Sequence, residues 1–331
     1  GGGGKVKEES GSMGRERLME CVTKGLKGAF KEVQVDLKKE KSIRKSMAPL
    51  IEAYTCGNQT LPTTAPISTT TWSYKRPVDG VVEPPRKVSV MVSREAAAVH
   101  VVEDFITEEE CREVEREAKR KGLMKASVAD EGGGSTFSPN RKALQAGIEV
   151  NWKLEESGDL ISRLSRRVFS YTNHNTNYGL GHEGQEDIMS IQYEGRGVND
   201  TEPDRYMPHC DGDCEGDEFR VGSRVATMVI YCEVPEAGGA TNFRQSNIHI
   251  KPKKYAATWF KYADITFTPG GDPVGVMDSG YTEHSGCPVL EGSKKIVTQW
   301  MRLGVSEDVK WDSFNTMGVS KKMVEDLLEQ C

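Results

Sequence analysis

The sequence predicts an α+β protein with a mainly β core, arranged as a double-sheet jelly roll with supporting helices packed on one sheet. Six short runs of β-branched and aromatic residues follow Gly181, with turn residues between them. About eight short strands separated by frequent turns are typical of a jelly roll. Two helical patterns precede these runs, and we expect their helices to cover one face of a sheet.

The composition is that of a globular protein with some disordered sequence. Of the 331 residues, 36% are apolar and 28% are charged, which suffices for one large domain or two smaller ones. The net charge of −6 is mild and well mixed, so the chain lacks the basic patch of a nucleic-acid-binding protein. No run approaches the roughly 18 consecutive apolar residues of a membrane span.

Residues 1–55 are predicted to form a flexible tail followed by an amphipathic helical segment. The first 12 residues are rich in Gly and charge, and from Leu18 onward apolar residues recur every three or four positions. Gly25 and Gly28 weaken this helix. It either packs on the domain or binds a partner such as a second subunit. Because the chain starts at Gly1 without Met, we expect a fragment whose start, with any targeting segment, lies outside it.

Residues 56–87 are rich in Pro, Thr and Ser and are predicted to be a linker, so we place the main domain at 88–305. The apolar run 99–106 suits a strand. Thr107-Glu-Glu-Glu110 is a capping box that opens a helix, which Gly122 would end. A second helix is predicted from one apolar stripe, formed by Leu160, Ile161, Leu164, Val168 and Tyr171.

The part of the chain after Gly181 changes to short β-rich runs between turns. Residues 306–331 follow the last of these runs and are predicted to be a helical tail that ends in an amphipathic piece, 323–328. The predicted strands are 188–193, 225–231, 248–251, 256–260, 274–277 and 296–300.

Two stretches distant in the chain predict a metal site. In a strand, residues two apart point to the same face, so His209 and Asp211 would offer an imidazole and a carboxylate side by side. His284 would supply a second imidazole. Two histidines and one carboxylate on one side of a metal suit Fe(II) and leave the other positions free for a co-substrate and dioxygen. Lys294 would be folded back to hold the far carboxylate of a dicarboxylic acid.

The ordered motifs around these residues resemble the catalytic domain of prolyl 4-hydroxylases. They read Tyr-x-x-His-x-Asp, then Gly-Gly-x-Thr-x-Phe, then His-x-x-Cys-Pro-Val-x-x-Gly-x-Lys with Trp300 six residues on. The resemblance covers residues 99–303, about two-thirds of the chain. It implies a distorted double-stranded β-helix that uses Fe(II), 2-oxoglutarate and O2, with ascorbate to rescue oxidised iron.

The resemblance also assigns the residues around the metal. Strand alternation points Lys294 and its neighbour Lys295 to opposite faces, and the family's Gly-x-Lys spacing implies that Lys294 holds the distal carboxylate of 2-oxoglutarate. Thr241 either helps to hold the same carboxylate or caps a turn made by Gly238 and Gly239. Trp300 shares the face of Lys294 and is either a pocket wall or core.

Three further side chains match family residues that face the active site. Tyr193 and Tyr206 would each donate a phenolic hydrogen bond to 2-oxoglutarate or to substrate, or else are buried in a sheet. Arg224 matches an arginine associated with the peptide substrate and is otherwise a surface ion-pair residue. The remaining histidines are expected to be structural or on the surface: His100, His174, His182 and His249.

The chain departs from the family pattern at its cysteines and in one acidic loop. Cys210 separates the first histidine from the aspartate. Its thiol either faces iron and O2, where it would be open to oxidation, or points away from the metal, as strand alternation predicts. Cys287 has no downstream cysteine nearby with which to pair. The acidic loop 211–219 either favours basic peptides or is solvated. The eight cysteines contain no CxxC pair, so disulfides are allowed and no zinc-ribbon site is indicated.

The predicted function is hydroxylation of peptidyl proline, coupled to decarboxylation of 2-oxoglutarate to succinate and CO2. The nearest alternative keeps the cofactors and changes the substrate to a lysyl or other side chain or a small molecule. A non-catalytic jelly roll that binds peptides is a second alternative. The partner would be a proline-containing peptide or protein. Two sequons, Asn58-Gln-Thr60 and Asn199-Asp-Thr201, and the resemblance favour the endoplasmic reticulum.

Overall fold

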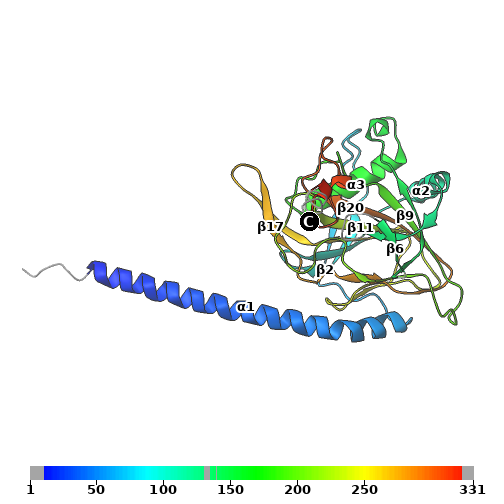
Figure 1. Ribbon diagram of the computed structural model, residues 1–331. Coiled ribbons are helices and arrows are strands. Elements are labelled where there is room, and N and C mark those ends of the chain that lie inside the picture. The colour runs from blue at the N-terminus through cyan, green and yellow to red at the C-terminus, as the bar shows by residue number, and fades with distance from the viewer. Residues whose placement is uncertain (1–10, 130–134, 139, 323–331) are drawn as a thin grey trace, which may run out of the picture. The chain divides into compact units, whose positions relative to one another are not determined.

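The computed structural model describes residues 11–129, 135–138 and 140–322 and divides the chain into two units, Gly1–Met47 and Ala48–Cys331. The described part of the first unit is helical. Helix α1 runs from Gly11 to Gly57, so that its last turns belong to the second unit (Figure 1). The predicted amino-terminal helix is therefore present, and residues 1–10 of the predicted tail lie outside the described residues.

The second unit contains a larger antiparallel sheet of nine strands, in the order β1-β2-β3-β15-β11-β20-β9-β8-β4. Five of the runs predicted to be strands lie in this sheet. The bounds, in sheet order, are β1 (Ser68–Trp72), β2 (Arg86–Ser93), β3 (Ala98–Val102), β15 (Ala257–Lys261), β11 (Arg224–Glu233), β20 (Ser293–Arg302), β9 (Ile188–Glu194), β8 (Leu144–Ile148) and β4 (Met124–Lys125).

A second antiparallel sheet of five strands faces the first. Its order is β14 (Ile248–Ile250), β13 (Thr241–Phe243), β18 (His284–Gly286), β10 (Arg205–His209) and β7 (Arg141–Lys142). Rings from the two sheets meet between them, with Phe243 of β13 5.2 Å from Phe260 of β15. Two facing sheets with a shared core confirm the predicted jelly roll.

Three two-stranded ribbons complete the β structure of the described residues. Their bounds are β5 (Ser127–Ala129) with β6 (Ser135–Phe137), β12 (Ala237–Gly238) with β19 (Val289–Glu291), and β16 (Ala263–Phe267) with β17 (Pro273–Met277).

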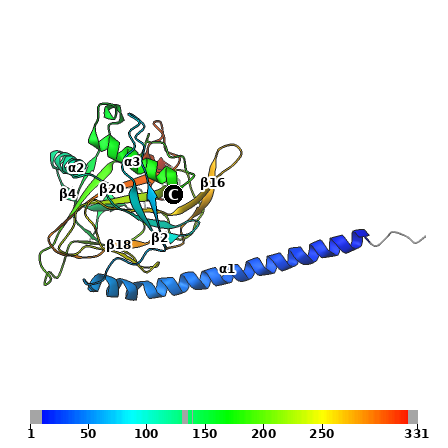
Figure 2. The ribbon, with the colours of Figure 1, turned by 180° about the vertical axis from the view of Figure 1, so that it is seen from behind.

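Both predicted helices cover the nine-stranded sheet. Helix α2 (Glu108–Lys121) packs on β8 and β9, and α3 (Leu160–Asn175) packs on β20; both lie on the same side of the molecule (Figures 1 and 2). The capping box at Thr107 is formed, and Gly122 ends α2. In α3 the predicted stripe faces the sheet: Ile161, Leu164, Val168 and Tyr171 are buried, and Leu160 is half-buried.

The structure differs from the predicted linker at residues 56–87. Strand β1 lies in this segment and pairs with β2, and the compact unit starts at Ala48 instead of near residue 88. Upstream of β1, Thr64 N donates to His249 O at 2.8 Å, and His249 N donates to Thr64 Oγ1 at 2.9 Å. The Thr-rich arm thus covers exposed backbone groups of edge strand β14, a role that β-branched residues and edge prolines suit.

The segment 306–322 also differs from the helical tail predicted for 306–331. Apart from the 3-10 turn Trp311–Ser313 and the helical residues Lys321 and Lys322, it is an irregular strap that pairs with the start of β11 through Met317 and Thr316. Asn315 accepts hydrogen bonds from the backbone of Met317 and Val319 and so forms a turn completed by Gly318, whose φ is +72°. The predicted amphipathic piece 323–328 lies outside the described residues.

Among the described residues, three disulfides link six cysteines: Cys56–Cys287, Cys111–Cys232 and Cys210–Cys214. Cys287 pairs with a cysteine 231 residues upstream, a partner that no short-range spacing could indicate. Across residues 11–129, 135–138 and 140–322, no helix combines the length and the apolar character that crossing a bilayer requires.

Candidate active site

The two histidines of the predicted metal site are brought together by strand pairing in the five-stranded sheet. His209 ends β10 and His284 begins β18, and the two residues are direct partners in the antiparallel register. Their rings lie 4.3 Å apart. Direct partners on one sheet face hold their side chains close together, so the sheet itself positions both imidazoles.

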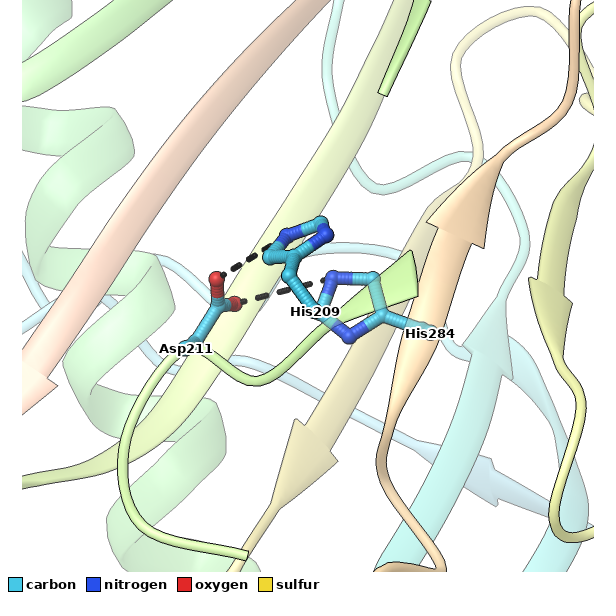
Figure 3. A group of neighbouring side chains, drawn as sticks. All are labelled: His209, Asp211 and His284. Carbon is cyan, nitrogen blue, oxygen red and sulfur yellow. Dashed lines mark ion pairs between the residues drawn. The ribbon is translucent and has the colours of Figure 1, made fainter. Parts of the chain in front are cut away.

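Asp211 completes this group, although it lies beyond the end of β10 and not within the strand as predicted. The bend after His209 returns its carboxylate, with Oδ1 3.5 Å from His209 Nε2 and Oδ2 3.9 Å from His284 Nε2 (Figure 3). One ligand atom from each residue lies within 4.8 Å of the others. Two imidazoles and a carboxylate on one side of a common point are the donor set that suits Fe(II).

The backbone fixes which nitrogen of each histidine faces this point. His209 Nδ1 donates to Met207 O at 2.8 Å, and His284 Nδ1 donates to Thr282 O at 3.0 Å. Both Nε2 atoms therefore carry a free lone pair that points toward Asp211. Burial lowers the pKa of His284 to about 4, so its imidazole is neutral at pH 7, as a metal ligand must be.

The Asp211 carboxylate is oriented by groups on the nine-stranded sheet. Thr227 Oγ1 donates to Asp211 Oδ2 at 2.8 Å, and an Arg224 Nη donates to the Asp211 backbone oxygen at 3.3 Å. Burial alone would raise the pKa of Asp211, but His284, His209 and Arg224 hold it below its usual range. The carboxylate is therefore ionised and held in place.

Lys294 extends from β20 in the opposite sheet into the same pocket. It is only 3% exposed, and its Nζ lies 5.5 Å from the ring of Tyr193 and 5.9 Å from that of Tyr231. Among the described residues it has no acidic partner. Burial lowers the pKa of Lys294 to about 8. A buried ammonium without a counter-ion is poised to bind an anionic group.

The neighbouring Lys295 points the other way, as strand alternation predicted. Its Nζ lies 3.2 Å from Glu115 and 2.8 Å from Glu233, and its side chain is partly exposed. Along β20, the residues at even positions line the pocket instead: Lys294, Ile296, Thr298 and Trp300. Trp300 is thus a pocket wall.

The Gly-Gly turn lies directly against Lys294. Gly238 and Gly239 have φ of +81° and +69°, and a Cβ on Gly239 would lie 3.2 Å from Lys294 Cδ. Thr241 follows this turn, lines the pocket, and its Oγ1 lies 2.9 Å from Tyr231 Oη. Thr241 and Lys294 therefore line one pocket, and the hydrogen bond of the Thr241 hydroxyl goes to Tyr231 and not to the Gly-Gly turn.

Several buried polar atoms that line the pocket have no hydrogen-bond partner in the described structure. They are Ser285 Oγ, Thr298 Oγ1, Trp300 Nε1 and Arg141 Nε. Buried polar groups are normally satisfied, so unpaired ones gathered around one pocket indicate that a polar ligand completes it.

The two predicted tyrosines both reach the pocket. Tyr193 is buried and pairs with Lys294 in the register of β9 and β20. Tyr206 stacks on His209 with ring centroids 3.5 Å apart, and burial raises the pKa of Tyr206 to about 12. The guanidinium of Arg141 lies 4.7 Å from the Tyr206 ring. Sequence analysis did not assign Arg141 to the site.

Arg224 and Trp300 form one wall of a groove of about 550 Å3 that opens from the metal site. The Arg224 guanidinium stacks 4.2 Å from the Trp300 ring and binds Glu186 through two hydrogen bonds of 2.5 and 2.6 Å. Glu186 also accepts a 2.6 Å hydrogen bond from the buried Arg302. One carboxylate thus serves two guanidinium groups, an arrangement the sequence analysis missed because neither partner is near Glu186 in the chain.

Replacement of Glu186 with Ala is expected to lower the free energy of unfolding by about 3–5 kcal/mol, because the guanidinium groups of Arg224 and Arg302 lose the carboxylate that pairs with both of them. Denaturant unfolding measures this loss. Glu183→Ala is the matched control, since Glu183 is exposed in the same loop, and its effect should stay within about 0.5 kcal/mol. Equal effects of the two changes would contradict the proposed network.

The four other histidines lie away from this pocket, as predicted. His100 is buried, and its Nδ1 lies 2.9 Å from Tyr171 Oη; burial lowers the pKa of His100 to about 4. His182 contacts Arg166, His249 belongs to β14, and His174 is exposed.

Comparison with known proteins gives the class to which this site belongs. Residues 197–302 match the family described as the 2OG-Fe(II) oxygenase superfamily. Prolyl 4-hydroxylase subunit alpha-1 of Gallus gallus is 28% identical over 60% of this chain and 34% of its own length. Prolyl 4-hydroxylase subunit alpha-1 of Caenorhabditis elegans is 27% identical over 69% of this chain and 36% of its own length. A probable prolyl 4-hydroxylase 4 of Arabidopsis thaliana is 26% identical over 75% of this chain and 78% of its own length.

Solved structures show similarity at lower identity. The viral collagen prolyl hydroxylase from Paramecium Bursaria Chlorella virus-1, in its 2OG complex, has a TM-score of 0.44 and 23% identity over 62% of this chain and 96% of that one. A Pseudomonas putida prolyl-4-hydroxylase has a TM-score of 0.40 and 16% identity over 62% of this chain and 92% of that one. The chain spans about a third of the length of the first curated relatives it matches, at 34%, 36% and 36%.

The site geometry and the match of residues 197–302 support a 2OG-Fe(II) oxygenase domain. Its similarity to prolyl 4-hydroxylases supports a prolyl 4-hydroxylase-like domain within that class. The family implies Fe(II), 2-oxoglutarate and O2, and ascorbate is typical of prolyl 4-hydroxylases. The pocket fits these groups: the two Nε2 atoms and the Asp211 carboxylate converge, and the unpaired ammonium of Lys294 faces the same space.

Proposed function

We propose that this domain hydroxylates proline in peptides or proteins and couples the reaction to decarboxylation of 2-oxoglutarate to succinate and CO2. The observation that carries the proposal is the pairing of a two-histidine, one-carboxylate group with a buried, uncompensated lysine in one pocket. A metal ligand group alone would suit many proteins. The added ammonium suits a co-substrate that carries a second carboxylate.

The roles proposed for the chain's own residues follow from their positions. His209, Asp211 and His284 would hold Fe(II), which supplies the oxidising chemistry when bound together with its co-substrate. Lys294, helped by the Thr241 hydroxyl, would bind the distal carboxylate of 2-oxoglutarate and so orient its keto-acid end toward the metal. The deep, largely buried pocket would exclude water from that end.

The proposed substrate position is the groove that leads from the metal site. Tyr206, which stacks on His209, lines this groove together with Trp300 and Arg224, so aromatic faces and guanidinium groups both contribute to it. Flat apolar faces suit the ring of a proline, and the groove extends to Trp311 and Phe314 of the strap. An extended peptide fits such an open groove better than a small molecule, which needs an enclosed cavity.

The test is succinate formation from 2-oxoglutarate with Fe(II) and ascorbate, across a panel of proline-containing peptides, with mass spectrometry of each peptide. We expect turnover to be stimulated by a subset of the peptides, each gaining one oxygen atom on proline. The matched control is the same peptide with its proline replaced by alanine. Stimulation by lysyl peptides only, with no oxygen added to proline, would replace the substrate assignment and leave the cofactor assignment intact.

We also propose that the domain works in an oxidising compartment such as the endoplasmic reticulum. Three disulfides in one domain support this, because disulfides persist where thiols are not kept reduced. Asn199 of one sequon is exposed. Peptide mapping of the protein from its native source without reduction should recover the three linked cysteine pairs, and recovery of free thiols at all six positions would contradict the proposal.

We propose that the amino-terminal helix binds a partner protein, which can be a second copy of this chain. Within the first unit, the large apolar side chains of α1 are exposed. Replacing Leu26 and Phe30 with Asp in the full chain is expected to lower the assembled mass measured by light scattering or to abolish partner capture. An unchanged mass and unchanged capture would contradict this role. The exposed side chains include Met19, Val22, Leu26, Phe30, Val33 and Leu37.

A further inference from the structure

A disulfide encloses one of the three metal ligands. Cys210 lies between His209 and Asp211, and it is bonded to Cys214, so that Asp211 is part of a covalent ring that spans residues 210–214. Cys210 also lines the groove that opens from the metal site. The sequence analysis treated Cys210 as a thiol, and no feature of the family pattern accounts for this bond.

We propose that the Cys210–Cys214 disulfide is a positioning device for Asp211 and that its reduction lowers the metal affinity of the site, which makes the proposed oxygenase sensitive to thiol redox state. The inference rests on the proposed function only in that the group of His209, Asp211 and His284 binds Fe(II). It requires no assumption about the peptide substrate.

The need for such a device follows from where β10 ends. The hydrogen-bonded strand holds His209, but Asp211 lies two residues beyond it in a bend, outside the ladder that fixes both histidines. The loop that follows is acidic and exposed from Glu215 to Glu218, so its carboxylates repel one another and pull the loop toward water. A covalent link across the base of the loop opposes that spreading.

Besides the two histidine ligands, the side chains that contact Asp211 come from β11. Thr227 binds its carboxylate and Arg224 binds its backbone oxygen, both from β11 of the opposite sheet. Gly212 packs against the ring of Tyr262, where a Cβ would lie only 2.7 Å from a ring carbon. The disulfide ties Cys210, the residue before Asp211, to Cys214 at the start of the exposed part of the loop. Metal affinity depends on such outer contacts, which typically contribute 10–100-fold.

Among the three disulfides, this one is the most open to reduction. Cys210 and Cys214 are both half-buried, whereas each other bond includes a buried cysteine, Cys111 or Cys287. The bond also joins residues only 4 apart in sequence, against 121 and 231 for the others. Its opening therefore releases only the 210–214 loop and leaves the two long-range cross-links in place.

The redox step is an ordinary thiol–disulfide exchange with a dithiol or with glutathione. A thiolate of the reductant attacks the sulfur of Cys210 or Cys214, the bond between the two cysteines breaks, and a mixed disulfide forms. A second reductant thiolate then releases the remaining cysteine. The protein gains two electrons and two protons as a pair of thiols, and the reductant leaves as its own disulfide. The reverse exchange restores the bond.

The test measures metal binding, and not enzymatic turnover, by the full chain with and without this disulfide. Co(II) serves as the probe, and its visible absorption reports both affinity and coordination. The variant Cys210→Ser with Cys214→Ser is expected to bind Co(II) at least tenfold more weakly, with altered absorption bands. The matched control, Cys111→Ser with Cys232→Ser, removes a disulfide distant from the ligands and should leave affinity and bands unchanged.

A second measurement uses the unmodified chain and so does not depend on how the variants fold. In a series of glutathione redox buffers, Co(II) affinity should fall over the same range in which Cys210 and Cys214 become open to alkylation, before the other four cysteines do. Unchanged affinity after selective reduction, or a double variant that binds Co(II) like the parent chain, overturns the inference. Failure of the peptide assay with this affinity change intact would instead count against the proposed substrate only.

Discussion

Asp211→Ala is expected to abolish metal binding and with it succinate formation, a loss well beyond the roughly 100-fold typical of residues that only support a metal ligand. The carboxylate is the single acidic member of the ligand group, and the two imidazoles that remain supply no negative charge to hold a divalent cation. The loss is measured as metal content after anaerobic loading with Fe(II) and as succinate produced per chain.

The matched control for this change is Asp217→Ala. Asp217 belongs to the same acidic loop but is exposed and lies outside the ligand group. Its replacement should leave the metal content and the turnover close to those of the parent chain. Metal binding that survives in Asp211→Ala, or that is lost equally in Asp217→Ala, would show that the loop supplies cation affinity by charge alone.

Lys294→Met is expected to have two large and opposite effects. The KM for 2-oxoglutarate should rise by two orders of magnitude or more, because removal of one partner of a buried charge pair costs about 3–5 kcal/mol. In the absence of 2-oxoglutarate, the same change should raise the free energy of unfolding by about 3 kcal/mol at pH 7, because it removes a buried ammonium that has no counter-ion in the described structure.

The gain in stability from Lys294→Met should depend on pH in a defined direction. Burial lowers the pKa of Lys294 from its ordinary value of 10.5 to about 8 in the folded chain. The charged lysine therefore destabilises the fold fully below pH 8, and this penalty disappears between about pH 8 and pH 10.5 as the group loses its proton in the folded state first. Denaturant unfolding of both proteins across this range measures the shrinking difference.

Lys295→Met is the control for both effects. Lys295 is adjacent in sequence but points to the opposite face of β20, where it is partly exposed beside Glu115 and Glu233. Its replacement should change stability by about 1 kcal/mol or less and should leave the KM unchanged. A larger effect on 2-oxoglutarate binding from Lys295 than from Lys294 would contradict the assignment of the two faces.

The features that could be predicted from the sequence are those set by local periodicity. The strand runs, the Thr107 capping box, the buried stripe of α3 and the even-numbered face of β20 all depend on side chains a few residues apart. The juxtaposition of His209 and His284, 75 positions apart in the chain, came from matched motifs and not from spacing. Their direct register then explains it.

The features that were missed depend on partners distant in sequence. The Pro/Thr-rich segment is predicted to be a linker because its own sequence does not show which strand it will contact. In the fold, Thr64 exchanges hydrogen bonds with the backbone of His249 in edge strand β14. Glu186 is one acidic residue among many until the fold places Arg224 and Arg302 on it. The bond between Cys56 and Cys287 likewise requires the folded chain. Each of these would have needed covariation or coordinates.

Asp211 shows the limit of a strand-based argument. Alternation predicted that it would share a face with His209 within one strand, and the carboxylate does meet the imidazole. However, β10 ends at His209, and the bend, the Cys210–Cys214 ring and the contact with Thr227 bring the carboxylate back. The prediction that Asp211 lies beside His209 is correct, but the strand geometry from which it was derived does not extend to Asp211.

The most direct test is anaerobic calorimetric titration of the chain with Fe(II) and then with 2-oxoglutarate, in the parent protein and in the Asp211→Ala and Lys294→Met variants. We expect one Fe(II) and one 2-oxoglutarate per parent chain, no tight Fe(II) binding in Asp211→Ala, and normal Fe(II) binding with weakened 2-oxoglutarate binding in Lys294→Met. Equal 2-oxoglutarate affinity in the parent and Lys294→Met, or unchanged Fe(II) affinity in Asp211→Ala, would contradict the site described above.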